Sequence, residues 1–154
     1  MDERRRQLIH VGSALAALSA AGLACARAAA AGESWNAKAF KAKDLEGVLQ
    51  ALGVSEPRSI DAMGIDAPDV AEDGTQVRIT VASQLPDTRY LSVLVDENPT
   101  VLIARFEVPA GTEPRFTLRI KMRETSRIYV LAEVGDQFFM TSRLVRVILG
   151  GCGP

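Results

Sequence analysis

The chain has 154 residues, of which 24% are charged, and 18 Lys and Arg against 19 Asp and Glu leave a formal net charge of −1. This length predicts one globular domain once any targeting segment is removed. The charge balance excludes a protein that binds nucleic acid by electrostatics, because no basic excess is present to neutralise phosphates.

Residues 1–31 have the layout of an export signal, with a positive region, an apolar stretch and a run of small residues. Arg5 and Arg6 resemble the twin-arginine pattern, which routes folded proteins across the bacterial inner membrane. A retained membrane anchor and, through Cys25, a lipoprotein are the alternatives. The Ala-rich run with its A-x-A ending favours removal instead. We therefore expect a periplasmic mature protein that is not attached to the membrane.

The next residues predict a lead-in and one short helix. Residues 32–40 are expected to be mobile. Leu45, Val48, Leu49 and Leu52 then fall at i, i+3, i+4 and i+7, which is one apolar face of a helix. Gly53 follows at the position where a left-handed residue commonly ends a helix. A helix this short is marginal alone, so we expect it to pack against a sheet.

Beyond the helix the hydrophobic period changes from 3.6 to 2, which is typical of antiparallel strands with one buried face. Turn signals such as "EDGT", "LPDT" and "PAGTEP" separate the apolar runs. The predicted strands are Ser59–Ile65, Gln76–Val81, Tyr90–Val95, Val101–Val108, Arg115–Arg123, Ile128–Val134 and Gln137–Leu149. Seven short strands without intervening helices predict an immunoglobulin-like antiparallel β-sandwich over residues 32–149.

The residues of the mature chain exclude most catalytic chemistry. Removal of residues 1–31 takes away His10 and Cys25, so Cys152 is the only cysteine and no histidine remains. Imidazole metal sites and Ser-His-Asp or Cys-His catalysis are then not available, and one cysteine cannot form a zinc cluster or a CxxC pair. We therefore expect no resident metal or cofactor.

Two groups of side chains leave weaker alternatives open. The carboxylates at 66–73 and 96–97 could bind calcium or form an acid/base pair, but acidic residues beside Gly and Pro favour solvated turns. The alternating cations Arg119, Lys121 and Arg123 favour an exposed strand face, although they could also serve acidic partners. The adjacent Phe138 and Phe139 must point to opposite faces of their strand, so we expect one in the core and one free to contact a partner.

The chain ends "LVRVILGGCGP", which places a single thiol between glycines. Gly150, Gly151 and Gly153 lack a Cβ, so residues 150–154 are predicted to form a flexible arm. Counted over the five residues from Ile148 to Cys152, an extended arm reaches about 16 Å, at about 3.3 Å per residue. Nothing in the sequence activates the thiol, because neither a helix N-terminus nor a fixed cation is evident beside it. The residues therefore predict a handle for other enzymes, or a thiol that forms an interchain disulfide.

The export signal, the helix "FKAKDLEGVLQALG", the all-β body and the terminal "GGCGP" together resemble the SoxY family. Members of that family are sulfur-carrier subunits of the periplasmic thiosulfate-oxidising (Sox) system. The family pattern ends Gly-Gly-Cys-Gly-Gly, whereas this chain ends in Pro154, which changes the extreme terminus that partner enzymes would meet. Proline fixes its own φ and restricts Gly153 before it, but leaves Cys152 and the preceding glycines free.

The resemblance implies a non-enzymatic carrier with sulfur intermediates bound covalently to Cys152. It also implies a heterodimer with a SoxZ-like β-sandwich subunit. Transient partners would be a haem-containing Sox cytochrome, a hydrolase that releases sulfate and a sulfane dehydrogenase. The alternative is an exported β-sandwich binding or structural domain whose lone cysteine makes an interchain disulfide. An autonomous thiol enzyme is disfavoured by the missing histidine.

Overall fold

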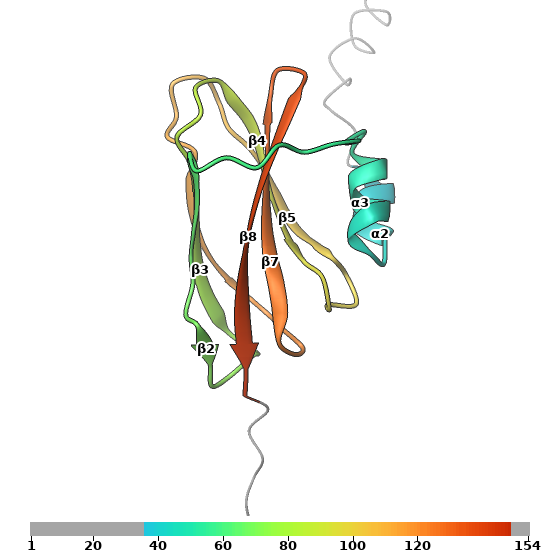
Figure 1. Cartoon of the computed structure of the whole chain (residues 1–154), viewed down its shortest axis with the longest axis vertical. Helices are drawn as coiled ribbons and strands as arrows, with labels where there is room; N and C mark the ends of the chain where they lie inside the picture. Colours follow the sequence, from blue (N-terminus) through green and yellow to red (C-terminus); the bar gives the residue numbers. More distant parts are fainter. Residues whose placement is uncertain (1–35, 149–154) are drawn as a thin grey trace, which may run out of the picture. The chain divides into compact units, whose positions relative to one another are not determined.

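The computed structural model describes residues 36–148, which form two sheets and a pair of helices (Figure 1). The first sheet has the order β1-β3-β6, and the second has the order β2-β8-β7-β4-β5. The strands are β1 (Met63–Asp66), β2 (Val70–Ala71), β3 (Val77–Ser83), β4 (Thr88–Val95), β5 (Leu102–Glu107), β6 (Arg115–Ile120), β7 (Ser126–Val134) and β8 (Gln137–Val147). The helices are α2 (Ala37–Lys41) and α3 (Leu45–Ala51). The predicted β-sandwich is confirmed.

The alternation of buried and exposed residues along the strands accounts for the first apolar core, which lies between the two sheets. In β3, Val77, Ile79 and Val81 are buried while Arg78 between them is exposed. They pack in one cluster with Leu91 and other inward-facing residues of the five-stranded sheet. Burial of such side chains drives association of the sheets, at roughly 25 cal/mol per Å² of apolar surface.

The five-stranded sheet buries its other face against the helices. Leu94 of β4 and Leu131 of β7 belong to a second cluster, which also contains Ala39 of α2 and Val48 of α3. Figure 1 accordingly shows both helices on the side of this sheet that lies away from β3. The helix α3 therefore packs against a sheet, as the sequence predicted.

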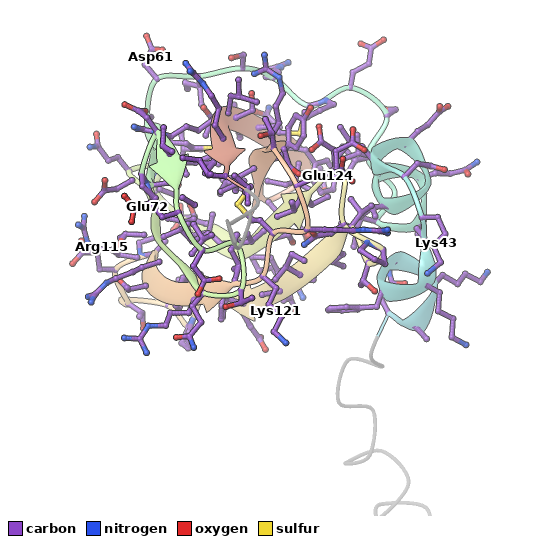
Figure 2. The ribbon with its side chains drawn as sticks, turned by 90° about the horizontal axis from the view of Figure 1, so that it is seen from below. Lys43, Asp61, Glu72, Arg115, Lys121 and Glu124 are labelled. Carbon is purple, nitrogen blue, oxygen red and sulfur yellow. The ribbon has the colours of Figure 1, made fainter. Side chains whose placement is uncertain are left out.

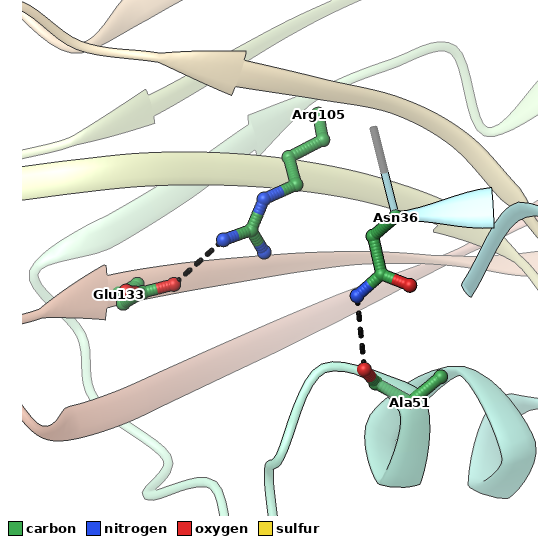
Figure 3. Close-up of polar contacts among 4 residues, drawn as sticks. All are labelled: Asn36, Ala51, Arg105 and Glu133. Carbon is green, nitrogen blue, oxygen red and sulfur yellow. Dashed lines mark hydrogen bonds and ion pairs between the residues drawn. The ribbon is translucent and has the colours of Figure 1, made fainter. Parts of the chain in front are cut away.

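Side-chain caps begin both helices. Asn36 Oδ1 accepts a hydrogen bond from Ala39 N at 3.1 Å, and Asp44 Oδ1 accepts one from Gly47 N at 2.6 Å. Such caps satisfy backbone donors that have no partner within the helix. Asn36 Nδ2 also donates to Ala51 O at 2.9 Å, which ties the start of α2 to the end of α3 (Figure 3). Gly53 follows α3 with φ +75°, as predicted for a residue that ends a helix.

The predicted mobile lead-in is wrong for the described residues 36–40. Ala37–Lys41 is helical, because Asn36 caps it and Ala39 is completely buried against the second cluster. The fold therefore has two short helices before the strands rather than one. This helix has too few apolar residues to show a period.

Several strand predictions also differ from the structure. The sequence missed β2, whose two residues pair with β8 in parallel, so the sandwich is not antiparallel throughout. The first predicted strand begins at Met63 rather than Ser59, and the predicted 115–123 strand ends at Ile120. Phe138 and Phe139 both pack against apolar clusters, one on each face of the sheet. The sequence predicted that one of the two, without saying which, would be free to contact a partner, whereas Phe138 packs on the helix side of the sheet and Phe139 on the opposite side.

One polar cluster lies on the helix-side face of the five-stranded sheet. Arg105 Nη2 forms a 2.8 Å ion pair with Glu133 Oε2 (Figure 3), and the guanidinium carbon lies 4.1 Å from the ring centroid of Tyr90. The ring and the carboxylate together hold the cation over the sheet. Within residues 36–148, no helix has the length and apolar character needed to span a membrane.

Candidate functional site

The site residues that the sequence singled out lie outside the described residues. They are Cys152, Gly150, Gly151 and Gly153 of the predicted arm, and Arg5 and Arg6 of the predicted export signal. Their roles therefore stay predictions. The structure does describe the point on the body where the C-terminal segment begins, at the end of β8.

The end of β8 is anchored by β2 and by a neighbouring turn. Ile148 N donates to Ala71 O at 2.9 Å, and Arg146 N donates to Asp69 O at 3.0 Å. Val147 N donates to Thr125 Oγ1 at 3.0 Å. Backbone hydrogen bonds thus hold the chain as far as Ile148, four residues before Cys152.

A groove of about 970 Å³ opens beside this anchor. Its apolar side chains come from both sheets and from the end of β8, and they include Ile103, Ile120, Met122, Val147 and Ile148. Its charged side chains are Arg119, Lys121, Arg123, Glu72 and Asp73. Sequence reasoning missed this groove, because its residues come from four separate segments of the chain.

Asn98 and Gly74 form hydrogen bonds beside the groove with the segment after β6. Asn98 Nδ2 donates to Lys121 O at 2.6 Å, and Asn98 Oδ1 accepts from Arg123 N at 3.1 Å, so this turn after β4 holds the segment after β6. Gly74 O accepts from Met122 N at 2.7 Å. A Cβ at Gly74 would overlap Met122 O, so only glycine permits this approach. The turn signal "EDGT" contains Gly74, but it does not reveal that Gly74 pairs with Met122.

Two of the acidic side chains serve turns, as the sequence favoured, whereas Asp66 lies in β1 and Asp69 forms an ion pair with Arg143. Asp73 accepts hydrogen bonds from the hydroxyl and the backbone amide of Thr75, and these bonds lower the pKa of its carboxyl group. Asp96 Oδ1 accepts from Arg127 N at 2.8 Å and from Glu97 N at 3.1 Å. Among the described residues, no group of three or more His, Cys, Asp or Glu side chains could hold a metal ion.

The comparisons with known proteins agree with this architecture. The family model described as "Sulfur oxidation protein SoxY" matches residues 49–152. The chain belongs to the SoxY family. The matched region runs from within α3 through all the strands to Cys152. The predicted family is therefore confirmed.

The comparison with solved structures found a similar protein. The chain matches the sulfur carrier protein SoxY from Chlorobium limicola f thiosulfatophilum with a TM-score of 0.64 and 29% sequence identity, over 69% of this chain and 97% of that one. An engineered protein matches with a TM-score of 0.39 and 10% identity, over 56% of this chain and 20% of that one. No curated protein sequence matches the chain.

Proposed function

We propose that this SoxY-family protein is a covalent carrier of sulfur intermediates, which it holds on Cys152. The observation that carries this proposal is the family match, which runs through Cys152 near the end of the chain. The similar protein from Chlorobium limicola is itself described as a sulfur carrier. The carried intermediates are those of thiosulfate oxidation.

In this proposal, residues 150–154 are a flexible arm on a fixed body. The backbone is anchored at Ile148, and Gly150, Gly151 and Gly153 allow the peptide to turn on either side of Cys152. An extended arm of about 16 Å can carry the sulfur into the active-site cleft of another protein. Pro154 restricts its own φ and the preceding Gly153, and leaves Cys152 and the glycines before it free.

The loading step joins two sulfur atoms by oxidation. The Cys152 thiol would lose its proton and bond to the outer sulfur of thiosulfate, and the two electrons released would be taken up by a haem-containing partner cytochrome in two successive one-electron reductions. The product is a cysteine S-thiosulfonate, Cys–S–S–SO₃⁻. The thiolate is the reactive form of such a cysteine.

The release step is a hydrolysis that needs no oxidant. Water attacks the sulfonate sulfur of the adduct, and the bond between that sulfur and its neighbour breaks. The products are hydrogen sulfate and a persulfide, Cys–S–SH, which remains on Cys152. A sulfane dehydrogenase could then oxidise the remaining sulfur.

The protein would present the substrate while separate enzymes transform it. Residues 36–148 contain neither histidine nor cysteine, which leaves the body without the usual residues for thiol or imidazole chemistry. We propose that Arg5 and Arg6 direct export by the twin-arginine route to the periplasm. There the protein would pair with a SoxZ-like β-sandwich subunit and meet the cytochrome, the hydrolase and the dehydrogenase transiently.

Intact-mass analysis of the mature protein tests the carrier function. Incubation with thiosulfate and the cognate oxidised Sox cytochrome should add one thiosulfonate to the wild-type chain. Cys152→Ser should abolish the adduct completely without changing the fold, measured by circular dichroism. A matched control combines Cys152→Ser with Ser55→Cys, which moves the thiol to an exposed position away from the arm. We expect this control to remain unloaded.

The alternative, an exported β-sandwich with a structural thiol, predicts a different result. Wild-type protein would then form a disulfide-linked dimer on a non-reducing gel and take up no sulfur adduct. Equal loading of the wild type and the Ser55→Cys control would also contradict the proposal, because it would show that any exposed thiol suffices.

A further inference from the structure

The outer face of the β1-β3-β6 sheet carries a concentration of positive charge. Arg78 of β3 lies directly opposite Arg119 of β6 in the strand register, and Arg115 lies on the same face of β6. Lys121 and Arg123 are exposed and continue the alternation past the end of β6. We call Arg78, Arg115, Arg119, Lys121 and Arg123 the basic face. Figure 2 shows Arg115 and Lys121 projecting away from the ribbon.

The basic face has a charge opposite to that of the domain around it. Residues 36–148 contain 14 Lys and Arg and 16 Asp and Glu, which gives a net charge of −2, and five of those 14 cations lie on this face. Asp66 of β1 is the only carboxylate on the three strands themselves, while Glu72 and Asp73 border the adjoining groove.

The cations of the basic face have no partner in the folded domain. Their side chains make no hydrogen bond or ion pair within residues 36–148, whereas Arg105 and Arg143 on the other sheet are each paired with a carboxylate. Like charges placed directly opposite one another across two strands destabilise a sheet. The Arg78–Arg119 arrangement therefore costs stability and is not compensated within the described chain.

The surface suits an acidic protein rather than a membrane or a nucleic acid. The exposed large apolar side chains of the described residues are Val70, Leu144 and Ile148, and none of them lies on this sheet, so it offers nothing to insert into a bilayer. The net negative charge of the domain disfavours nucleic acid. Cations spread along a strand face attract a broad acidic surface and accelerate its association.

The basic face also lies beside the start of the C-terminal segment. Arg119, Lys121 and Arg123 border the same groove as Ile148. An extended arm from Ile148 reaches about 16 Å. A protein seated on these cations would therefore have its surface within reach of Cys152.

We propose that the basic face is the docking surface for an acidic patch on the cytochrome that loads Cys152. This inference rests on the carrier function proposed above and names the surface that serves it. Opposite charges bring the cytochrome to the edge of the groove, and the arm then delivers the thiol to the haem.

Charge reversal on two faces tests the docking surface. Arg78→Glu with Arg119→Glu reverses the basic face, and Lys38→Glu with Lys41→Glu makes the same charge change on the exposed side of α2, across the five-stranded sheet. The readout is the second-order rate of adduct formation on Cys152 with thiosulfate and the cognate cytochrome. It is measured at low ionic strength and at about 0.15 M, where the Debye length is about 8 Å.

We expect the wild-type rate to fall as salt rises. The Arg78/Arg119 variant should load about 10-fold or more slowly at low salt, with a flatter salt dependence. The Lys38/Lys41 variant should remain within about 2-fold of wild type. Because removal of the like-charge pair relieves repulsion, Arg78→Gln with Arg119→Gln should fold at least as well as wild type. This Arg78→Gln/Arg119→Gln protein is the second variant, and we expect its loading rate to lie between those of the wild type and the Arg78/Arg119 charge-reversal variant.

The other outcomes each overturn a distinct claim. Loading of both reversed variants at the wild-type rate, or an equal loss in both, overturns the docking surface and leaves the carrier function standing. No adduct on wild type overturns the carrier function and the docking with it. Binding to anionic phospholipid vesicles that is lost in the Arg78/Arg119 variant, while loading is unchanged, shows that the face serves a membrane and also overturns the proposal.

Discussion

Two different layers cover the two faces of the five-stranded sheet. On one face lies the β1-β3-β6 sheet, whose strands come from residues 63–120 and are held by ladders between distant segments. On the other face lie α2 and α3, which together occupy only residues 37–51. Each layer contains apolar side chains that are completely buried, such as Val81 in the sheet layer and Val48 in the helical layer.

The difference between the layers concerns what holds each one in place. A strand of the sheet has backbone partners in its neighbours, whereas helices of five and seven residues are too short to persist alone. The helical layer depends on its caps and on contacts with the second cluster. The sheet layer is held by its own backbone ladders, so its outer face can carry unpaired arginines. These arginines weaken the sheet, and we assign them to the binding of a partner.

The largest expected effect compares one leucine on each face of the sheet. Leu91→Ala, in the cluster between the sheets, and Leu131→Ala, beneath the helices, should each lower the free energy of unfolding by about 2–5 kcal/mol, measured by urea denaturation. Hydrogen exchange should separate them. Leu131→Ala should reduce protection of α2 and α3 more than that of β3, while Leu91→Ala should not. Equal loss of protection in both layers for both variants would show that the layers unfold as one unit.

A smaller effect is expected from the cap of the helical layer. Asp44→Ala removes the acceptor for Gly47 N and should destabilise α3 by about 1 kcal/mol. Hydrogen exchange of α3 amides, compared with those of β7, measures this change. The control Gln50→Ala, at an exposed position of the same helix, should leave the exchange rates nearly unchanged. Loss of protection in the strands to the same degree would mean that the helical layer is not a separate unit.

The smallest expected effect is a loss of stability at alkaline pH. It concerns Tyr129, whose ring packs against the second cluster. Burial raises the pKa of its phenol above the ordinary value of 10.0, and the negative charge of Asp96 adds to this. The unfolded chain therefore releases the proton at a lower pH than the folded chain. Stability is lost as the pH rises from about 10 through the folded pKa. Tyr129→Phe should show a shallower decline in urea denaturation across that range, and an identical decline would contradict the assignment.

Much of the fold could be predicted from local patterns. The apolar period of Leu45, Val48 and Leu49 and the position of Gly53 predicted α3 and its end, and alternation predicted most strands within a few residues. The helix α2 could not be found in this way. It is a single turn with one buried side chain, and its stability comes from the cap and from packing.

The candidate site was predictable only in part. The sequence singles out Cys152 as an isolated thiol, and it shows that Arg119, Lys121 and Arg123 alternate with buried residues. It does not show that Arg78 faces Arg119, because strand register depends on the pairing of two segments about 40 residues apart. Nor does it show the groove, which forms where the ends of several segments meet.

The sequence by itself determined the sandwich class, the family and the position of the single thiol of the predicted mature chain, because hydrophobic period and terminal motif are local properties of the chain. Only the tertiary structure decided that β2 pairs in parallel with β8, that both phenylalanines at 138 and 139 are packed, and that Arg119, Lys121 and Arg123 border one groove with the end of β8. These features arise from contacts between segments far apart in the chain. Their geometry is set when the sheets and helices close over their two apolar cores.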